Sequence, residues 1–278
     1  MREFYLENAI GERRSLQTKR ECFLRAPSGL GWADTNTYAS AQGFFPRTFS
    51  EPSQPAPMGD FVFGGYEDYR DFVDWVHKGY DLTLVYSPDS AEYRIDIDLL
   101  SVQKGEINAW GRLECPFVMA AKTPWYKPTT RELVIAPPAS EVGYRRYPYK
   151  YTTQYAASSL SNQVEIYASG HLPAALYMVC PGPLANPKLT LLGPTGAVIG
   201  LLDLTGIGIE AGEMLIYSTK FGQTGVWRDG TDLLPELDLN NNNFFDVPIN
   251  QTCTLRLESD TDIETVATIQ LFEYYRSV

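Results

Sequence analysis

Clustered prolines between residues 113 and 138 constrain the fold of this chain more than any other feature. A strand-like run from Leu113 to Ala120 precedes Thr123-Pro-Trp-Tyr-Lys-Pro128, and Pro137-Pro138 follows one further apolar stretch. Proline fixes φ and lacks a backbone N–H, so such clusters end sheet ladders and stiffen connections. The sequence therefore predicts a joint between two β-rich domains, residues 1–136 and residues 137–278.

The N-terminal domain is predicted to combine strands with one helix. Glu3 to Glu7 and Glu12 to Leu16 read as a β-hairpin around a glycine turn. From Tyr66 to Lys78, apolar residues recur at i, i+3, i+4 and i+7, the spacing of a helix with one apolar face. Gly79 is expected to end this helix in the left-handed conformation. We expect the apolar face to cover an open sheet.

A proline-rich stretch from Phe49 to Pro57 lies between two predicted strands. It cannot be a central strand, because each proline removes a ladder hydrogen bond. We therefore predict an exposed arm or loop in this part of the chain.

Beyond the prolines, short strands recur between Gly, Pro and Asn turns, which is typical of a sandwich or jelly roll. The predicted strands are Val164 to Tyr167, Ala175 to Cys180, Lys188 to Leu192, Val198 to Leu204, Met214 to Ser218, Phe244 to Pro248, Thr252 to Glu258, and Thr265 to Tyr275.

The charge balance argues against binding to nucleic acid. The formal net charge is -11, and a phosphate backbone attracts the opposite sign. The four cysteines are far apart, which indicates buried free thiols. Since neither a signal peptide nor an apolar run of about 18 residues is present, we expect synthesis and folding in a reducing cytosol, with no membrane partner.

No catalytic, metal or cofactor site is expected. Only two histidines occur, no Gly-x-Ser-x-Gly elbow is present, and no Cys/His cluster has the spacing of zinc ligands. Asp96 and Asp98 share one face of a predicted strand, for which solvation is the far commoner explanation than an acid/base pair. Asp238 opens a stretch like a calcium loop, but Asn243 stands where that loop needs glycine.

Aromatic side chains are the remaining candidates for binding. Trp125, Trp227 and the tyrosine run that includes Tyr149 are expected to be exposed. They could stack on sugar rings or fill a subunit interface, where Tyr and Trp are enriched. The sequence leaves both uses open.

The chain resembles the distal tail proteins of siphophages that infect Gram-positive hosts. The resemblance is collinear over nearly the whole chain, and no single motif is specific. Its N-terminal marks are Glu3-Phe-Tyr-Leu-Glu-Asn8, Phe23-Leu-Arg-Ala-Pro-Ser-Gly-Leu-Gly31, Tyr66-Glu-Asp-Tyr-Arg-Asp-Phe-Val73 and Thr123-Pro-Trp-Tyr126. Its C-terminal marks are Gly170-His-Leu-Pro-Ala-Ala175, Pro181-Gly-Pro183, Asn241-Asn-Asn-Phe-Phe245 and Glu273-Tyr-Tyr-Arg-Ser-Val278.

The resemblance implies a structural hub without enzymatic activity. An N-terminal domain with one helix would close into a hexameric ring, and a galectin-like β-sandwich would follow it. The implied partners are further copies of the chain, the tail tube protein, the tail-associated spike or fibre protein, and receptor-binding proteins. The implied location is the distal end of the virion's tail, after assembly in the host cytoplasm. By position, the stretch from Phe44 to Met58 would be a protruding hairpin, with the candidate interface residues Phe44, Phe45, Phe49 and Met58.

Two rival functions stay open. The first is a host-saccharide adhesin that acts through the C-terminal sandwich, with Trp227 and Tyr149 as candidate contacts. The second is a depolymerase of wall or capsule, which would need paired carboxylates in an aromatic cleft. The sequence offers no motif of that kind.

Overall fold

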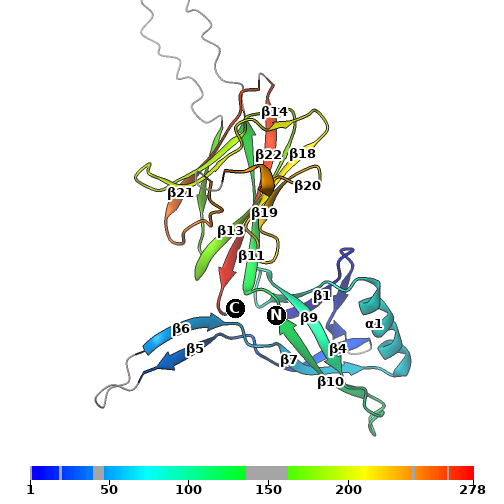
Figure 1. The fold of residues 1–278 in the computed structure, drawn as a ribbon. Coiled ribbons are helices and arrows are strands. Elements are labelled where there is room, and N and C mark those ends of the chain that lie inside the picture. The colour runs from blue at the N-terminus through cyan, green and yellow to red at the C-terminus, as the bar shows by residue number, and fades with distance from the viewer. Residues whose placement is uncertain (1, 19–20, 40–46, 136–161, 239–241, 262) are drawn as a thin grey trace, which may run out of the picture. The chain divides into compact units, whose positions relative to one another are not determined.

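The computed structural model of the chain describes residues 2–18, 21–39, 47–135, 162–238, 242–261 and 263–278. It contains two compact units (Figure 1), which we call the N-terminal unit (Met1–Lys127 with Tyr274–Val278) and the C-terminal unit (Pro128–Glu273). The predicted domain boundary between residues 136 and 137 lies outside the described residues and stays a prediction.

In its described residues, the N-terminal unit contains ten strands, one helix, and the ends of two strands that continue into the C-terminal unit. These elements are β1 (Glu3–Glu7), β2 (Arg13–Ser15), β3 (Gln17–Thr18), β4 (Cys22–Ser28), β5 (Ala33–Tyr38), β6 (Arg47–Ser53), β7 (Met58–Phe63), α1 (Tyr66–Lys78), β8 (Leu82–Ser87), β9 (Tyr93–Val102), β10 (Leu113–Ala121), and the ends of β11 (Trp125–Ile135) and β22 (Thr265–Tyr275).

One antiparallel sheet organises this unit. Strand β1 pairs with β2 and β8, as the predicted hairpin requires, and the order continues β8-β9-β10-β7-β4-β3. Leu16, which is fully buried, bridges β1 and β4, which stand near the two ends of this strand order. Its N–H donates to the Phe4 carbonyl, and its own carbonyl accepts from the Leu24 N–H, both at 2.9 Å. The sheet therefore closes around a core.

Helix α1 has the bounds that the sequence predicts and packs on this core. The Phe72 ring lies 5.0 Å from Phe61 and 5.3 Å from Phe63, centroid to centroid. The left-handed ending at Gly79 is wrong, because its φ is -152°, which is extended backbone. A Cβ at this position would make a tight contact, 3.2 Å from the backbone N of Ala9 in the β1–β2 turn.

The described part of the C-terminal unit contains short strands and one 3-10 turn. They are the remainder of β11 and β22 together with β12 (Gln163–Tyr167), β13 (Leu172–Pro181), β14 (Leu184–Ala185), β15 (Lys188–Leu192), β16 (Val198–Asp203), β17 (Gly208–Ile209), β18 (Met214–Ser218), β19 (Gly225–Arg228), β20 (Thr231–Asp232), η1 (Leu234–Glu236) and β21 (Thr252–Glu258).

Two sheets of the C-terminal unit share one core, which confirms the predicted sandwich. One sheet has the order β20-β19-β18-β13-β22-β11, and the other has the order β12-β21-β15-β16. Buried residues from both sheets, such as Met178 and Leu255, belong to a single apolar cluster.

The predicted strand from Phe244 to Pro248 is wrong. Only Val247 forms a bridge, to Ala174. The Phe245 N–H donates to the Tyr217 hydroxyl instead of to a ladder. The Phe245 ring fills the space where Gly200 has no side chain, since a Cβ there would lie 2.3 Å from it. Side-chain packing holds this segment in place of strand pairing.

Candidate protein interface

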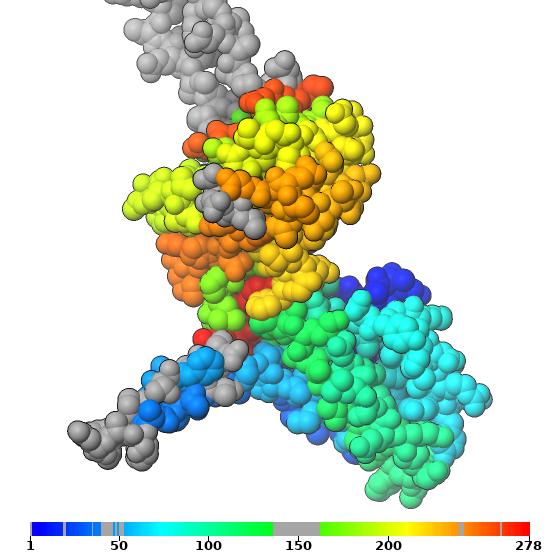
Figure 2. All heavy atoms as spheres, viewed as in Figure 1, coloured from blue at the N-terminus to red at the C-terminus, as the bar shows by residue number. Residues whose placement is uncertain are grey.

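Strands β5 and β6 form a two-stranded sheet of their own. They pair antiparallel from Ala33 opposite Ser53 to Tyr38 opposite Arg47. In Figures 1 and 2 they run out from the rest of the N-terminal unit, and we call them the arm. Neither strand pairs with any further strand in the described part of the chain. Their outer edges are therefore open to a strand from another protein.

Large apolar side chains on the arm lie in solvent. Trp32, just before β5, is 57% exposed, Tyr38 is 58% exposed and Phe49 is 52% exposed. Exposed aromatic side chains are frequent anchors of protein interfaces. The interface candidate Phe49 is therefore exposed, whereas Phe44 and Phe45 lie outside the described residues. The sequence did not identify Trp32 and Tyr38 as interface candidates, because β5 is mostly polar and lacks an apolar alternation.

The root of the arm is tightly packed. Gly29 has a φ of +77°, and a Cβ on it would lie only 2.1 Å from the Ala56 carbonyl oxygen. The Gln54 side-chain amide donates to the Gly31 carbonyl at 3.0 Å and to the Gly29 carbonyl at 3.4 Å. These contacts hold the segment that leads into β5 against the segment that follows β6.

A second exposed apolar group adjoins the root, and we call Met58, Val118 and Leu100 the outer patch. Met58 on β7 lies directly opposite Val118 on β10. Leu100 lies at the irregularity where β9 shifts register against β10. They are 46%, 37% and 64% exposed. Alternate residues of β7 and β10 point to the core, so the outer patch lies on the opposite face of the sheet.

An ion triad fixes the surface beside the outer patch. The Arg25 guanidinium lies 2.9 Å from Asp60 and 2.7 Å from Glu114, so it connects β4, β7 and β10. Its side chain is 47% exposed, and surface pairs of this kind contribute at most about 1 kcal/mol. The triad therefore fixes the positions of side chains on this face and adds little to the free energy of unfolding.

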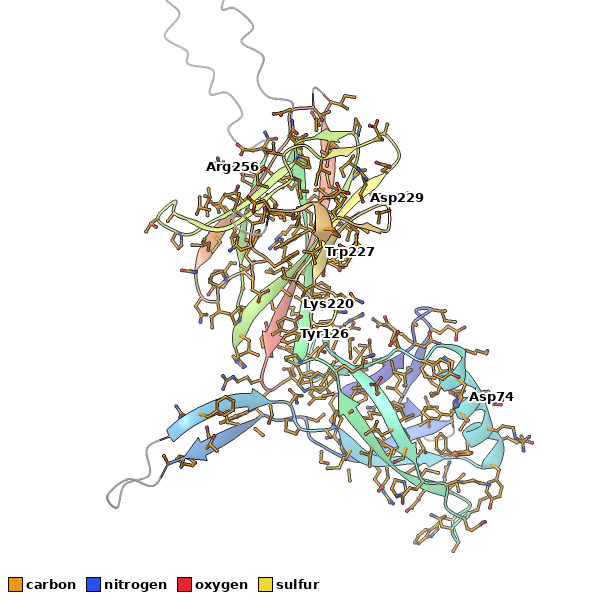
Figure 3. All side chains as sticks on the ribbon, in the orientation of Figure 1. Asp74, Tyr126, Lys220, Trp227, Asp229 and Arg256 are labelled. Atoms are coloured by element: carbon orange, nitrogen blue, oxygen red, sulfur yellow. The ribbon has the colours of Figure 1, made fainter. Side chains whose placement is uncertain are left out.

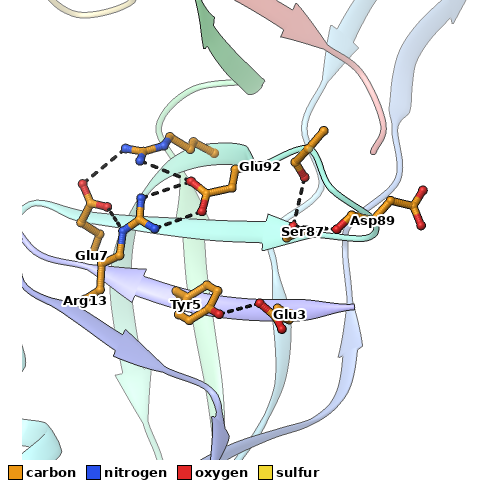
Figure 4. A network of polar contacts seen from close by, with 9 residues as sticks. Glu3, Tyr5, Glu7, Arg13, Ser87, Asp89 and Glu92 are labelled. Atoms are coloured by element: carbon orange, nitrogen blue, oxygen red, sulfur yellow. Dashed lines mark hydrogen bonds and ion pairs between the residues drawn. The ribbon is translucent and has the colours of Figure 1, made fainter. Parts of the chain in front are cut away.

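A second polar network secures the β1–β2 hairpin (Figure 4). Arg13 donates to both carboxylate oxygens of Glu92, at 3.0 and 3.2 Å, and its Nε donates to Glu7 at 2.8 Å. Arg94 also contacts Glu7, at 3.3 Å. The hydrogen bond from Arg13 lowers the pKa of Glu92 below its ordinary value. The network ties the hairpin to the start of β9.

The loop between β9 and β10 presents a tryptophan. Trp110 is 85% exposed. The Asn108 carboxamide oxygen accepts from the N–H groups of Trp110 and Arg112, both at 3.0 Å. The Asn108 amide group donates to Glu114 at 3.1 Å. A fixed turn thus holds a large apolar side chain in solvent, a feature that sequence reasoning missed.

The aromatic candidates near and beyond the joint have different surroundings. Trp125 is fully buried beside Tyr86, so its expected exposure is wrong. Trp227 on β19 is half-buried (Figure 3), and a Cβ on Gly225 would lie 2.5 Å from its ring. The indole therefore lies flat over Gly225. Tyr149 is outside the described residues, and saccharide binding stays a prediction.

The polar candidates are engaged in structural contacts. Asp96 accepts hydrogen bonds from Thr83 at 2.9 Å and from Tyr126 at 2.7 Å, whereas Asp98 contacts Lys122 at 3.5 Å. Burial raises the pKa of Tyr126. His77 lies at the end of α1, with Nδ1 2.8 Å from the Val73 carbonyl.

All four cysteines are free and buried, which confirms the sequence prediction. Burial raises the pKa of the Cys22 and Cys180 thiols to about 12. In the described residues, no group of three His, Cys, Asp or Glu side chains could hold a metal ion. No helix in that part of the chain has the length and apolar character needed to cross a membrane.

Comparison with known proteins gives a family match for the N-terminal part of the chain and a fold for the whole of it. The family described as distal tail protein, N-terminal domain, matches residues 3–122. A chain of the phage P2 baseplate in its activated conformation with Ca has a TM-score of 0.67 and 17% identity, over 100% of both chains. No curated protein sequence matches this chain.

A second solved structure has the same fold over nearly the whole chain. It is the SPP1 Dit protein, described as a paradigm of hub adsorption apparatus in Gram-positive infecting phages. Its TM-score is 0.59 at 12% identity, over 97% of this chain and 98% of that one. At such identities the likeness establishes the fold.

Proposed function

We propose that this chain, whose residues 3–122 match the N-terminal domain of distal tail proteins, is a distal tail protein and a structural hub at the tip of a phage tail. In this proposal six copies close into a ring that joins the tail tube to the spike or fibre and to the receptor-binding apparatus. The chain contributes contacts rather than chemistry. A Gram-positive host is part of the same proposal.

The arm is the observation that carries this proposal. It combines open strand edges with three side chains that are more than half exposed, Trp32, Tyr38 and Phe49. A monomeric protein would expose these edges and aromatic groups to aggregation. A closed ring covers them, because each arm contacts a different surface on the next copy and the series ends where it began.

The outer patch and the Trp110 loop supply further contact surfaces in the same unit. Both are apolar and formed on ordered backbone, so little conformational entropy is lost when a neighbour binds them. The formal net charge of -11 also suits a ring whose bore passes DNA, since an acidic bore does not hold phosphate.

The location of the chain in the virion tests this proposal. Gold-labelled antibody against the purified chain should mark the end of the tail that is distant from the capsid, with pre-immune antibody as the control. Label along the whole tail or on the capsid would overturn the hub function. A ring of six formed by the isolated chain is the second test.

A further inference from the structure

The last five residues of the chain are part of the N-terminal unit. Tyr274 is 2% exposed, and its ring lies edge-on to Tyr126 at 6.4 Å. The Tyr275 ring lies edge-on to Tyr93 at 5.2 Å. Val278 packs against the apolar core of the same unit. The chain therefore ends in fixed contacts with a domain that begins more than 200 residues earlier.

Between these anchors, Arg276 reaches the arm. Its Nη1 lies 3.4 Å from Oδ1 of Asp34, at the start of β5, and the two side chains are 38% and 18% exposed. Asp34 is opposite Pro52 of β6, so the contact is made where the arm leaves the unit. In Figure 1 the C-terminal end of the chain lies beside the arm.

We propose that the C-terminal residues fix the direction of the arm, with Arg276 as the positioning residue. The contacts of Gly29 and Gln54 join the two segments of the arm to each other. The contact of Arg276 with Asp34 connects the arm to the C-terminal residues. The ring contacts of Tyr274 and Tyr275 hold these residues on the N-terminal unit. An arm that is already directed when it meets a neighbour loses less conformational entropy on binding.

Hydrogen exchange on the full-length chain tests the proposal directly. Arg276→Glu and Asp34→Arg should each raise amide exchange in residues 33–38 and 47–53, by up to about fivefold for a partly exposed pair. The double variant Asp34→Arg with Arg276→Glu should restore slow exchange. Residues 3–7 and 82–87, in β1 and β8, should keep their exchange rates in all variants.

A matched control and a milder variant keep the test decisive. Arg256→Glu changes an arginine that pairs with Glu258 in the C-terminal unit at 3.6 Å, and it should leave exchange in the arm unchanged. Arg276→Gln removes the charge without placing a carboxylate beside Asp34, so it provides the same test without repulsion. Unchanged exchange in the arm for every single variant, or no recovery in the double variant, would overturn the proposal.

The consequence for assembly rests on the proposed hub function, and the two can fail separately. If the single variants also weaken ring formation and the double variant restores it, both are supported. If the arm responds in hydrogen exchange while the wild-type chain never forms rings, the hub function fails and the role of Arg276 stands. If rings form and the arm does not respond, the role of Arg276 fails.

Discussion

Met58 and Val118 lie directly opposite each other on β7 and β10, with both side chains exposed. The neighbouring residues Phe61 and Phe117 point to the other face, where their rings stack at 4.1 Å. The same two strands thus build the core of the N-terminal unit and the outer patch. A substitution on the exposed face can therefore change association without changing the fold.

Val118→Lys should weaken ring formation by about tenfold or more, because the contact would bury a charged group. The free energy of unfolding should change by no more than about 0.5 kcal/mol, since the site is on the surface. Sedimentation velocity and urea unfolding measure the two effects. Val266→Lys, at a valine of the C-terminal unit that is 41% exposed, is the matched control. Equal weakening by both variants would contradict a specific role for the outer patch.

Gly29→Ala should disturb the root of the arm and abolish ring formation. The new Cβ would lie 2.1 Å from the Ala56 carbonyl oxygen, in addition to the strain of a φ of +77°. Gly11→Ala is the control, because Gly11 has a φ of +80° with no atom near its Cβ position. It should cost only the backbone strain of about 1–2 kcal/mol. If the two variants have equal melting temperatures and both form rings, the close packing at the root is unimportant.

Trp110→Ala should lower the infective titre of the phage by about tenfold or more, because it would remove an anchor of the proposed interface. The isolated chain should melt at an unchanged temperature, since Trp110 is 85% exposed. Trp110→Phe keeps an apolar ring and should preserve most of the titre. A wild-type titre for Trp110→Ala would show that the loop makes no contact that matters for assembly.

The buried thiols should be unreactive in the folded chain. Burial raises the pKa of Cys22 and Cys180 to about 12, from an ordinary value of 9.0, so both are neutral thiols at pH 8. Iodoacetamide should label them only after unfolding in guanidinium. Because the folded chain holds these protons more tightly, their contribution to stability is complete below about pH 9 and is lost as the pH rises towards 12. Rapid labelling of the native chain at pH 8 would contradict this.

Local patterns in the sequence predicted the elements that depend on near neighbours. The helix from Tyr66 to Lys78 follows from its apolar spacing, and the separation of β6 from the larger sheet follows from the proline-rich stretch of Phe49 to Pro57 that it enters. Gly79 was assigned the wrong conformation, because the helix ends there in extended backbone, which a glycine after an apolar helix face does not reveal.

Contacts between distant segments account for what the sequence did not predict. Met58 was a candidate, but its partner Val118 is 60 residues away and is identified only by strand register. Trp125 was expected in solvent and is buried by packing against β8. The contact of Arg276 with Asp34 joins residues separated by 242 positions, which no local pattern encodes.

The mass of the purified full-length chain tests the hub function most directly. Size exclusion coupled to light scattering should give about six times the 31.2 kDa mass of one chain, with ring-shaped particles in negative stain. A mass of one chain at the highest soluble concentration, unchanged after addition of the tail tube protein and the tail-associated protein of the same phage, would contradict the account.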